Sequence, residues 1–195
     1  MILKICTAGD PVLRQAARPL TREEILEAHV QELIAHMRDT VRDAPGVGLA
    51  APQIGLGLQV AVIEDRPEYV ASLSARQIDE RGRRPVPFHV IINPVLYREA
   101  EAEVDFFEGC LSLPGFSALV PRATNVRVEC LDQHGMPQVI HASGWYARIL
   151  QHEIDHLNGT LYLDRMHTRT FTSLDNLARH WKDRNAEEIH AALQP

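Results

Sequence analysis

Two histidines four residues apart are the first feature of this sequence that could do chemistry. His152 and His156 enclose Glu153 in the segment His152-Glu-Ile-Asp-His156. Residues at this spacing share one face of an α-helix, so both imidazoles could reach the same metal ion. Glu153 is rotated by roughly 100° from His152 about the helix axis, so its carboxylate could border the ion without binding it. The pattern predicts a metal site with a carboxylate placed to take a proton from water.

A third protein ligand has to come from outside this helix, because two imidazoles do not make a stable site. Our candidate is Cys110, in Glu108-Gly-Cys-Leu-Ser-Leu-Pro-Gly115. Gly109 frees the backbone before the thiol, and a thiolate is a strong ligand for a borderline or soft divalent ion. We expect Cys6 and Cys130 to be ordinary small apolar residues.

A zinc endopeptidase is the alternative that the histidine pair leaves open. One type continues as His-Glu-x-x-His-x-x-Gly-x-x-His, and this chain has Gly159 at the glycine position but Tyr162 in place of the third histidine. Another type takes a downstream glutamate, for which Glu187 and Glu188 are available in a stretch that we expect to be exposed. The remaining histidines singled out as surface or capping residues are His29, His36, His134, His167, His180 and His190.

The composition is that of an ordinary globular protein. Of 195 residues, 45% are apolar and 24% are charged, which excludes a disordered chain, a coiled coil and a collagen-like repeat. The formal net charge of −6 gives no global basic field, so we expect no stable binding to nucleic acid. Three cysteines without a Cys-x-x-Cys pair predict a reducing compartment. The longest apolar stretch contains four glycines and polar residues, so we expect no membrane span.

Apolar periodicity and capping residues predict three helices, over 22–42, 144–158 and 174–193. The first follows a capping-box pattern, with Thr21 as the N-cap and Glu24 three residues later. The second carries the histidine pair and has Asn158-Gly159 as its C-terminal stop. The third is polar enough to lie on the surface.

Strands are predicted over 58–63 and 88–93, and as a hairpin of 126–131 with 138–141. The glycine-rich segment 46–55 predicts a buried loop, and the polar segment 66–87 predicts an exposed excursion. Strands and helices do not alternate strictly, so the class is α+β. We expect one domain over 1–195, with mixed or antiparallel strands around a central metal-binding helix and a C-terminal helical extension over 172–195.

Three segments together resemble the peptide deformylase family: Gly46-Val-Gly-Leu-Ala-Ala-Pro-Gln53, Glu108-Gly-Cys-Leu-Ser112 and Gln151-His-Glu-Ile-Asp-His156. They stand in the family's order, and the similarity runs from about residue 5 to 173. The resemblance implies a metallohydrolase of linear amides that acts in protein biosynthesis, in co-translational N-terminal processing. It would remove the formyl group from the N-terminal formylmethionine of new polypeptides and release formate.

The resemblance also implies a role for each motif. Cys110, His152 and His156 would hold one Fe²⁺ ion per chain, with Zn²⁺, Ni²⁺ or Co²⁺ as substitutes. A hydroxide on the metal would attack the formyl carbonyl, with Glu153 as general acid/base. The side chain of Gln53 and the backbone N–H of Leu111 would stabilise the oxyanion. Substrate contacts are implied for Val47, Gly48, Gly109, Trp145 and Arg148, with Gly48 binding the peptide as an added strand.

The segments 142–148 and 167–171, which flank the metal helix, resemble the organellar, mitochondrial-type branch of the family. Trp145 and Arg148 would then border the entrance for the methionine side chain. Because no Arg- and Ser-rich leader precedes the domain, we expect a bacterial cytoplasmic protein, with the mitochondrial matrix as the alternative. The expected partner is the formylmethionyl nascent peptide, with the ribosome exit region as a further candidate and no membrane. A non-catalytic relative would lack Glu153, Gln53 or a ligand, and all are present.

Overall fold

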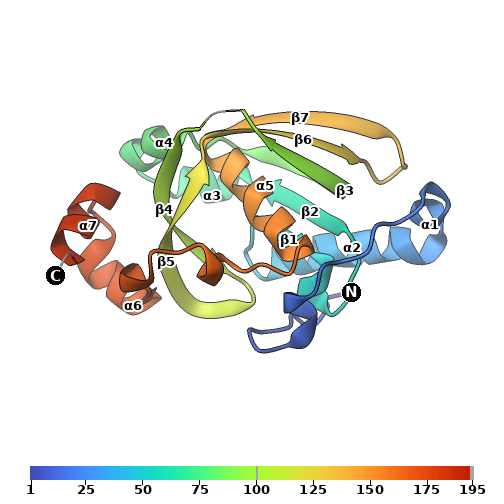
Figure 1. Ribbon diagram of the computed structural model, residues 1–195, viewed down its shortest axis with the longest axis horizontal. Coiled ribbons are helices and arrows are strands. Elements are labelled where there is room, and N and C mark those ends of the chain that lie inside the picture. The colour runs from blue at the N-terminus through green and yellow to red at the C-terminus, as the bar shows by residue number, and fades with distance from the viewer. Residues whose placement is uncertain (100, 194–195) are drawn as a thin grey trace.

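A five-stranded antiparallel sheet packs against a central helix, α5 (Gly144–Leu157). The computed structural model describes residues 1–99 and 101–193. The strand order across the sheet is β1 (Gly48–Ala50), β2 (Val60–Asp65), β3 (Val86–Arg98), β6 (Asn125–Leu131) and β7 (Pro137–Ser143). Figure 1 shows α5 at the centre of the molecule, between this sheet and the second one. The α+β class and the central helix are as predicted.

The second sheet is a long hairpin that the sequence analysis did not predict. It pairs β4 (Glu103–Cys110) with β5 (Leu113–Ala123), and the short β8 (Thr172–Ser173) adds to β5 at Phe116 and Ser117. Cys110 is the last residue of β4 and pairs with Leu113 across the turn. The hairpin therefore decides where the thiol lies.

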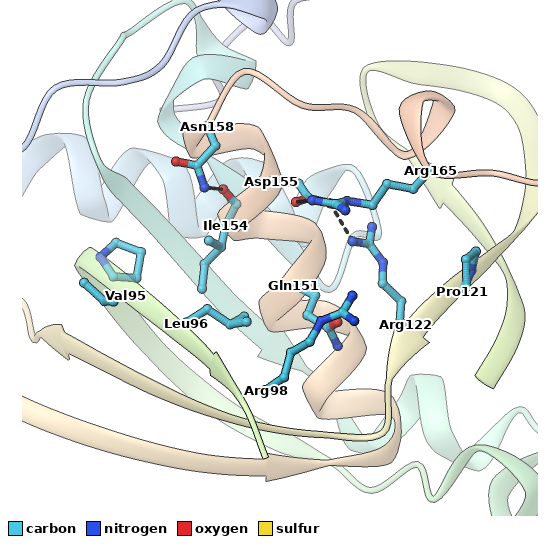
Figure 2. A pocket seen from close by; sticks show the side chains of 11 residues that line it. Val95, Leu96, Arg98, Pro121, Arg122, Gln151, Ile154, Asp155, Asn158 and Arg165 are labelled. Carbon is cyan, nitrogen blue, oxygen red and sulfur yellow. Dashed lines mark hydrogen bonds and ion pairs between the residues drawn. The ribbon is translucent and has the colours of Figure 1, made fainter. Parts of the chain in front are cut away.

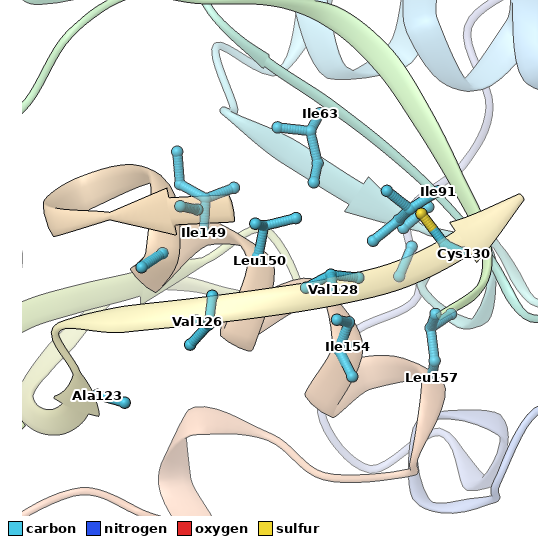
Figure 3. Packing of buried hydrophobic residues seen from close by; sticks show 14 residues of the cluster. Ile63, Ile91, Ala123, Val126, Val128, Cys130, Ile149, Leu150, Ile154 and Leu157 are labelled. Atoms are coloured by element: carbon cyan, nitrogen blue, oxygen red, sulfur yellow. The ribbon is translucent and has the colours of Figure 1, made fainter. Parts of the chain in front are cut away.

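The middle of the five-stranded sheet, β2 and residues 90–92 of β3, is buried on both faces, because its residues alternate between two apolar clusters. Ala61 and Ile63 of β2 face α5, whereas Val60 and Val62 face the helix α2 (Ala28–Asp43). Figure 3 shows the first cluster, in which Ile149, Leu150, Ile154 and Leu157 of α5 pack on Ile63, Ile91, Val126, Val128 and Cys130. Cys130 is buried there, as expected of a small apolar residue.

The predicted helix over 22–42 is two helices, α1 (Arg22–Leu26) and α2, which meet at an extended Glu27. The capping box is confirmed, because Thr21 Oγ1 accepts from the Glu24 N–H at 3.2 Å and a Glu24 carboxylate oxygen accepts from the Thr21 N–H at 2.7 Å. On a continuous helix, Ile25 and Val30 would lie about 140° apart. The break allows both to be buried in one cluster.

The segments predicted as a loop and as an exposed excursion contain more structure than expected. Residues 46–55 are buried as predicted but include β1 and a 3-10 turn (Ala51–Ile54). Residues 66–87 contain α3 (Pro67–Ala71) and α4 (Ala75–Arg81). The excursion is not exposed throughout, because Arg83 is buried and donates two hydrogen bonds of 2.8 Å to Asp65.

The predicted C-terminal helix over 174–193 is interrupted. It comprises α6 (Leu174–Asn176), a π-helical turn (Leu177–Trp181) and α7 (Ala186–Leu193). Asn185 and Glu188 cap α7 reciprocally, each side chain accepting a backbone N–H of the other at 2.9 Å, which starts a new helix at this point. The remaining short helices are 3-10 turns at Pro11–Arg14, Tyr162–Asp164 and Thr168–Thr170. Within the described ranges, no helix is both long and apolar enough to cross a membrane.

The end of α5 provides a test of the fold. Asn158 caps the helix, and Gly159 has a φ of +70°, where an added Cβ would lie 2.8 Å from the Arg14 carbonyl carbon. We expect Gly159→Ala to lower the free energy of unfolding by about 2 kcal/mol or more, because backbone strain adds to a clash with backbone.

Gly57→Ala is the matched control, because a Cβ at residue 57 meets nothing within 4 Å. Its free energy of unfolding should change by less than about 1 kcal/mol. Equal losses for the two variants in urea unfolding would contradict this account of the helix end.

Candidate metal centre

The three predicted ligands meet between α5 and the turn of the β4–β5 hairpin. One ligand atom each from Cys110, His152 and His156 lies within 4.8 Å of the others. The Cys110 Sγ is 3.3 Å from His156 Nε2, and the ring centroids of the two histidines are 4.9 Å apart. The histidines come from successive turns of one helix, and the sheet brings the thiol to them. One sulfur and two imidazole nitrogens form a donor set that fits a borderline divalent ion.

Glu108 holds the first histidine in position. A carboxylate oxygen of Glu108 accepts a hydrogen bond from His152 Nδ1 at 2.9 Å, which leaves Nε2 of this ring for an ion. The same carboxylate accepts two bonds of 2.9 Å from Arg122 and one of 2.7 Å from Arg148. Burial by itself raises the pKa of Glu108, but the bonds from His152 and Arg122 outweigh it and keep this pKa well below its ordinary value. Glu108 is therefore a buried, ionised hydrogen-bond acceptor.

A neighbouring flank of α5, on which Gln151 and Asp155 lie, is tied to the same network (Figure 2). Asp155 accepts a hydrogen bond from Arg122 and two bonds of 2.7 Å from Arg165. Gln151 clamps the backbone of Ala123, accepting from its N–H at 3.0 Å and donating to its carbonyl at 2.9 Å. These contacts fix the rotation of α5 against β5, and so the direction in which the two histidines point.

The ionisation of the two histidines differs. Burial together with the nearby His152 lowers the pKa of His156 well below its ordinary value. Burial also opposes the charged form of His152, but hydrogen bonds with Cys110 and Glu108 overcome it and raise the pKa of this ring well above its ordinary value. A bound cation would take the place of the proton on His152, because metal ligation and protonation compete for the same nitrogen.

Glu153 lies beside the trio and lines the cavity over it. Its side chain is buried, and its Oε2 has no hydrogen-bond partner among residues 1–99 and 101–193. Burial raises the pKa of Glu153 to about 7. A Cβ at Gly48 would lie 2.2 Å from Glu153 Oε1, so the carboxylate fills the space where a side chain of β1 would stand.

Gln53 presents its amide N–H to the cysteine. Its Oε1 accepts from the Ala50 N–H at 2.9 Å, which fixes the orientation of the amide. Its Nε2 donates to Ser112 Oγ at 3.3 Å and lies 3.5 Å from the Cys110 sulfur. Leu111 occupies the turn directly after the cysteine. Gln53 and Leu111, the two residues predicted to provide oxyanion donors, thus lie next to the predicted ligand Cys110.

A cavity of about 540 Å³ opens over this centre. All five predicted substrate-contact residues line it: Val47, Gly48, Gly109, Trp145 and Arg148. The Trp145 indole N–H is buried and has no partner in the part of the chain that the structure describes. The guanidinium of Arg148 is bonded to Glu108 and to the Val120 carbonyl, so its polar atoms face the protein. A substrate contact of Arg148 through these atoms stays a prediction.

Several residues of the site were not identified from the sequence. Glu108 and Arg122 form the network behind the ligands, and Arg81 and Arg83 from the segment 66–87 line the cavity. A signal was available for Arg122, because a lone charge within the apolar run 118–123 indicates a buried ion pair. Leu174 and Leu177 of the C-terminal segment also line the cavity, and no local pattern points to this.

Between His156 and residue 193, the last that the structure describes, no third ligand of an HExxH endopeptidase joins the two histidines. Glu187 and Glu188 are exposed on α7, and neither lines the cavity over the trio. Tyr162, at the position of the third histidine, is buried and stacks on His152 with ring centroids 6.4 Å apart. The downstream residues considered for an endopeptidase thus provide no ligand here, and the endopeptidase alternative is not favoured.

Comparisons with known proteins agree with the motifs. The model of the family described as polypeptide deformylase matches residues 2–171. The chain is 48% identical over 173 residues to "Peptide deformylase 1A, chloroplastic" of Solanum lycopersicum, covering 89% of this chain and 62% of that protein. It is 44% identical over 194 residues to "Peptide deformylase 3" of Streptomyces avermitilis, covering 98% of this chain and 83% of that protein.

A solved structure shares the fold. The Met-Ala-Ser-bound crystal structure of a class I type b peptide deformylase from Acinetobacter baumannii matches with a TM-score of 0.75 and 29% identity, covering 85% of this chain and 99% of that one. The Solanum lycopersicum relative and "Peptide deformylase 1A, chloroplastic/mitochondrial" of Arabidopsis thaliana are longer than this chain, which spans 62% and 65% of their lengths.

The Glu108 network generates a stability prediction. Glu108→Gln keeps the size of the side chain but removes the charge that compensates Arg122 and Arg148. We expect the free energy of unfolding of the metal-free protein to fall by about 3 kcal/mol or more, because a buried ion network loses one partner.

The control is Glu80→Gln, which removes an exposed pair with Arg76 one helical turn away. Its effect should stay below about 0.5 kcal/mol. A loss for Glu108→Gln no larger than that of the control, measured by urea unfolding, would show that the network does not hold the hairpin against α5.

Proposed function

The chain belongs to the polypeptide deformylase family, and we propose that it removes the formyl group from the N-terminal formylmethionine of newly made polypeptides. The single observation that carries this proposal is the convergence of Cys110, His152 and His156 beside Glu153, under a cavity that Cys110, His152 and Glu153 line. The reaction is hydrolysis of a linear amide: water adds to the formyl carbon, the C–N bond breaks, and formate and a free amine leave. We treat residues 1–195 as one catalytic domain, with 172–195 as its C-terminal extension.

Cys110, His152 and His156 would hold one divalent metal ion. Their sulfur and nitrogen donors suit several ions, and we propose Fe²⁺, with Zn²⁺, Ni²⁺ or Co²⁺ as substitutes. When bound, the ion would supply Lewis-acid chemistry, lowering the pKa of water and polarising the formyl carbonyl. Glu108 would hold His152 in the tautomer that leaves Nε2 for the ion.

Glu153 is the proposed general acid/base. Its unpartnered, buried Oε2 is free to accept the proton of the attacking water and to pass it to the leaving amine. The two proton transfers use the same carboxylate, so the residue ends the cycle as it began. The close fit against Gly48 keeps this carboxylate at the edge of β1.

Gln53 and the backbone N–H of Leu111 are the proposed oxyanion donors. The Gln53 amide is held by Ala50, so its N–H already points to the ligand cysteine before substrate binds. Each such donor lowers the barrier by about 2–4 kcal/mol in comparable enzymes. The turn after Cys110 brings the second donor to the same place because the β4–β5 hairpin ends there.

The substrate peptide would bind as an additional strand. β1 lies at the edge of its sheet and pairs with β2, so its outer edge can accept an extended peptide at Gly48. Trp145 and Ile149 give the cavity apolar walls for the methionine side chain. The structure of the Acinetobacter baumannii relative is described as bound to Met-Ala-Ser, which supports a peptide that begins with methionine as the ligand.

The location of the activity follows from this substrate. Relatives include chloroplastic, mitochondrial and bacterial proteins, and we propose the bacterial cytoplasm for this chain, with the mitochondrial matrix as the alternative. Nascent formylmethionyl peptides are the proposed partners. A contact with the ribosome exit region stays a prediction.

The first functional test concerns Glu153. We expect Glu153→Gln to lower kcat for formate release from a formyl-Met tripeptide by about 10²–10⁴-fold, because the proton carrier is lost while the ligands remain. Glu32→Gln, an exposed change on α2, is the control and should retain full activity. Wild-type protein that holds one equivalent of metal at this centre and releases no formate would overturn the proposal.

The second functional test concerns the sulfur ligand. We expect Cys110→Ser to weaken retention of Fe²⁺ by at least about tenfold, since changes that only support a ligand already cost that much. Cys130→Ala, which removes a thiol in the apolar core, should retain wild-type metal content. Unchanged iron in anaerobically purified Cys110→Ser would argue that Cys110 is not a ligand.

A further inference from the structure

A second group of metal-binding side chains comes together away from the cavity. It consists of Asp105 of β4, His167 just before a 3-10 turn, and His190 of α7. One ligand atom from each lies within 4.8 Å of the others. None of the three belongs to the proposed catalytic trio, and the sequence analysis expected both histidines to be surface or capping residues.

Both imidazoles direct the same nitrogen at one carboxylate. His167 Nε2 is 3.1 Å from each oxygen of Asp105, and His190 Nε2 is 2.8 Å from one of them. The two rings stand almost perpendicular, at 87°, with centroids 4.6 Å apart. This convergence is comparable with that of the catalytic trio, in which Cys110 Sγ and His156 Nε2 are 3.3 Å apart.

Each of the three ligands is held by ordered backbone. Asp105 pairs with Pro121 within the β4–β5 hairpin. The His167 N–H donates to the Leu119 carbonyl at 3.0 Å, and α7 docks through the buried Ile189, next to His190. Side chains that rigid elements aim at one point form a pre-organised site.

We propose that Asp105, His167 and His190 form a second metal site, which binds a divalent transition-metal ion such as Zn²⁺. Two imidazoles and one carboxylate are a common set of three protein ligands for zinc, and His167 is exposed enough for water to complete the coordination. The donor set lacks sulfur, so it differs from the catalytic trio in the ions that it prefers.

The second site would fasten the C-terminal segment to the body of the protein. Asp105 lies on the β4–β5 hairpin, whereas His190 lies on the last helix of the described chain. Between His167 and His190 the chain passes through Leu174 and Leu177, which line the cavity over the catalytic trio. An ion at the second site would therefore stabilise one wall of that cavity without touching the reacting groups.

The test compares the number of zinc ions bound by the full wild-type chain with the numbers bound by two variants. Metal-free protein is titrated with Zn²⁺, and bound metal is counted after removal of free ion. We expect His190→Ala to bind one equivalent fewer than wild type. His180→Ala, which removes an exposed histidine of the same C-terminal segment, should bind as many as wild type. Equal stoichiometry in wild type and His190→Ala would overturn the second site.

This outcome is independent of the proposed function. If the catalytic trio bound no metal, the number of bound ions would fall equally in wild type, His190→Ala and His180→Ala. The difference between wild type and His190→Ala would remain. A titration with Co²⁺ separates the sites further, because only the thiolate site gives sulfur-to-cobalt charge-transfer absorption. Cys110→Ser should lose that band and still bind Co²⁺ at the second site, and failure to bind there would contradict the proposal.

Limited proteolysis tests the fastening role. Lys182 and Arg184 directly precede α7 and are exposed trypsin sites, and Arg179 is a further exposed site in the preceding helical turn. Zn²⁺ at ten times its Kd should slow cleavage there about tenfold in wild type, because binding reduces the open population by the factor 1 + [L]/Kd. It should leave the rate for His190→Ala unchanged. An equal effect of Zn²⁺ on both proteins would show that the site does not hold α7.

Discussion

The buried charge of Glu108 is the interaction on which the centre depends. One carboxylate joins Arg122, Arg148 and the proposed ligand His152, so it connects the hairpin, the central helix and the candidate metal site. An unpaired buried charge at this depth would destabilise the fold. Each charged group of the network therefore depends on the presence of its partners. The energetic consequence is that the hairpin, with Cys110 at its end, cannot move independently of the histidines.

The candidate residues of the centre could be proposed from the sequence because they lie in short, local motifs. A helix with two histidines four residues apart needs only local periodicity to be recognised, and the stop at Asn158-Gly159 follows from backbone preferences. Cys110 was proposed as the third ligand from residue type and turn chemistry, and its sulfur lies 3.3 Å from His156 Nε2. Its position could not be predicted in the same way, since the β4–β5 pairing joins residues up to 20 apart.

The hairpin was missed because β5 carries residues that normally exclude a strand. Pro121 and the pair Pro114-Gly115 suggest turns, yet all three lie within β5. β8 reaches only Phe116 and Ser117, so Pro121 lies where the outer edge of β5 has no strand partner, and its missing N–H costs nothing. The breaks in the helices over 22–42 and 174–193 have the same origin, because tertiary burial and capping overrode a continuous helical pattern.

The contact between Gly48 and Glu153 has a consequence for how this fold can vary. The carboxylate of the helix occupies the volume that a side chain of the edge strand would need. The separation between the proposed substrate strand and the proposed proton carrier is then fixed by main-chain atoms rather than by a choice of rotamer. A larger residue at position 48 would be compatible only with a shorter acid at position 153, so the two sites are constrained to evolve as a pair.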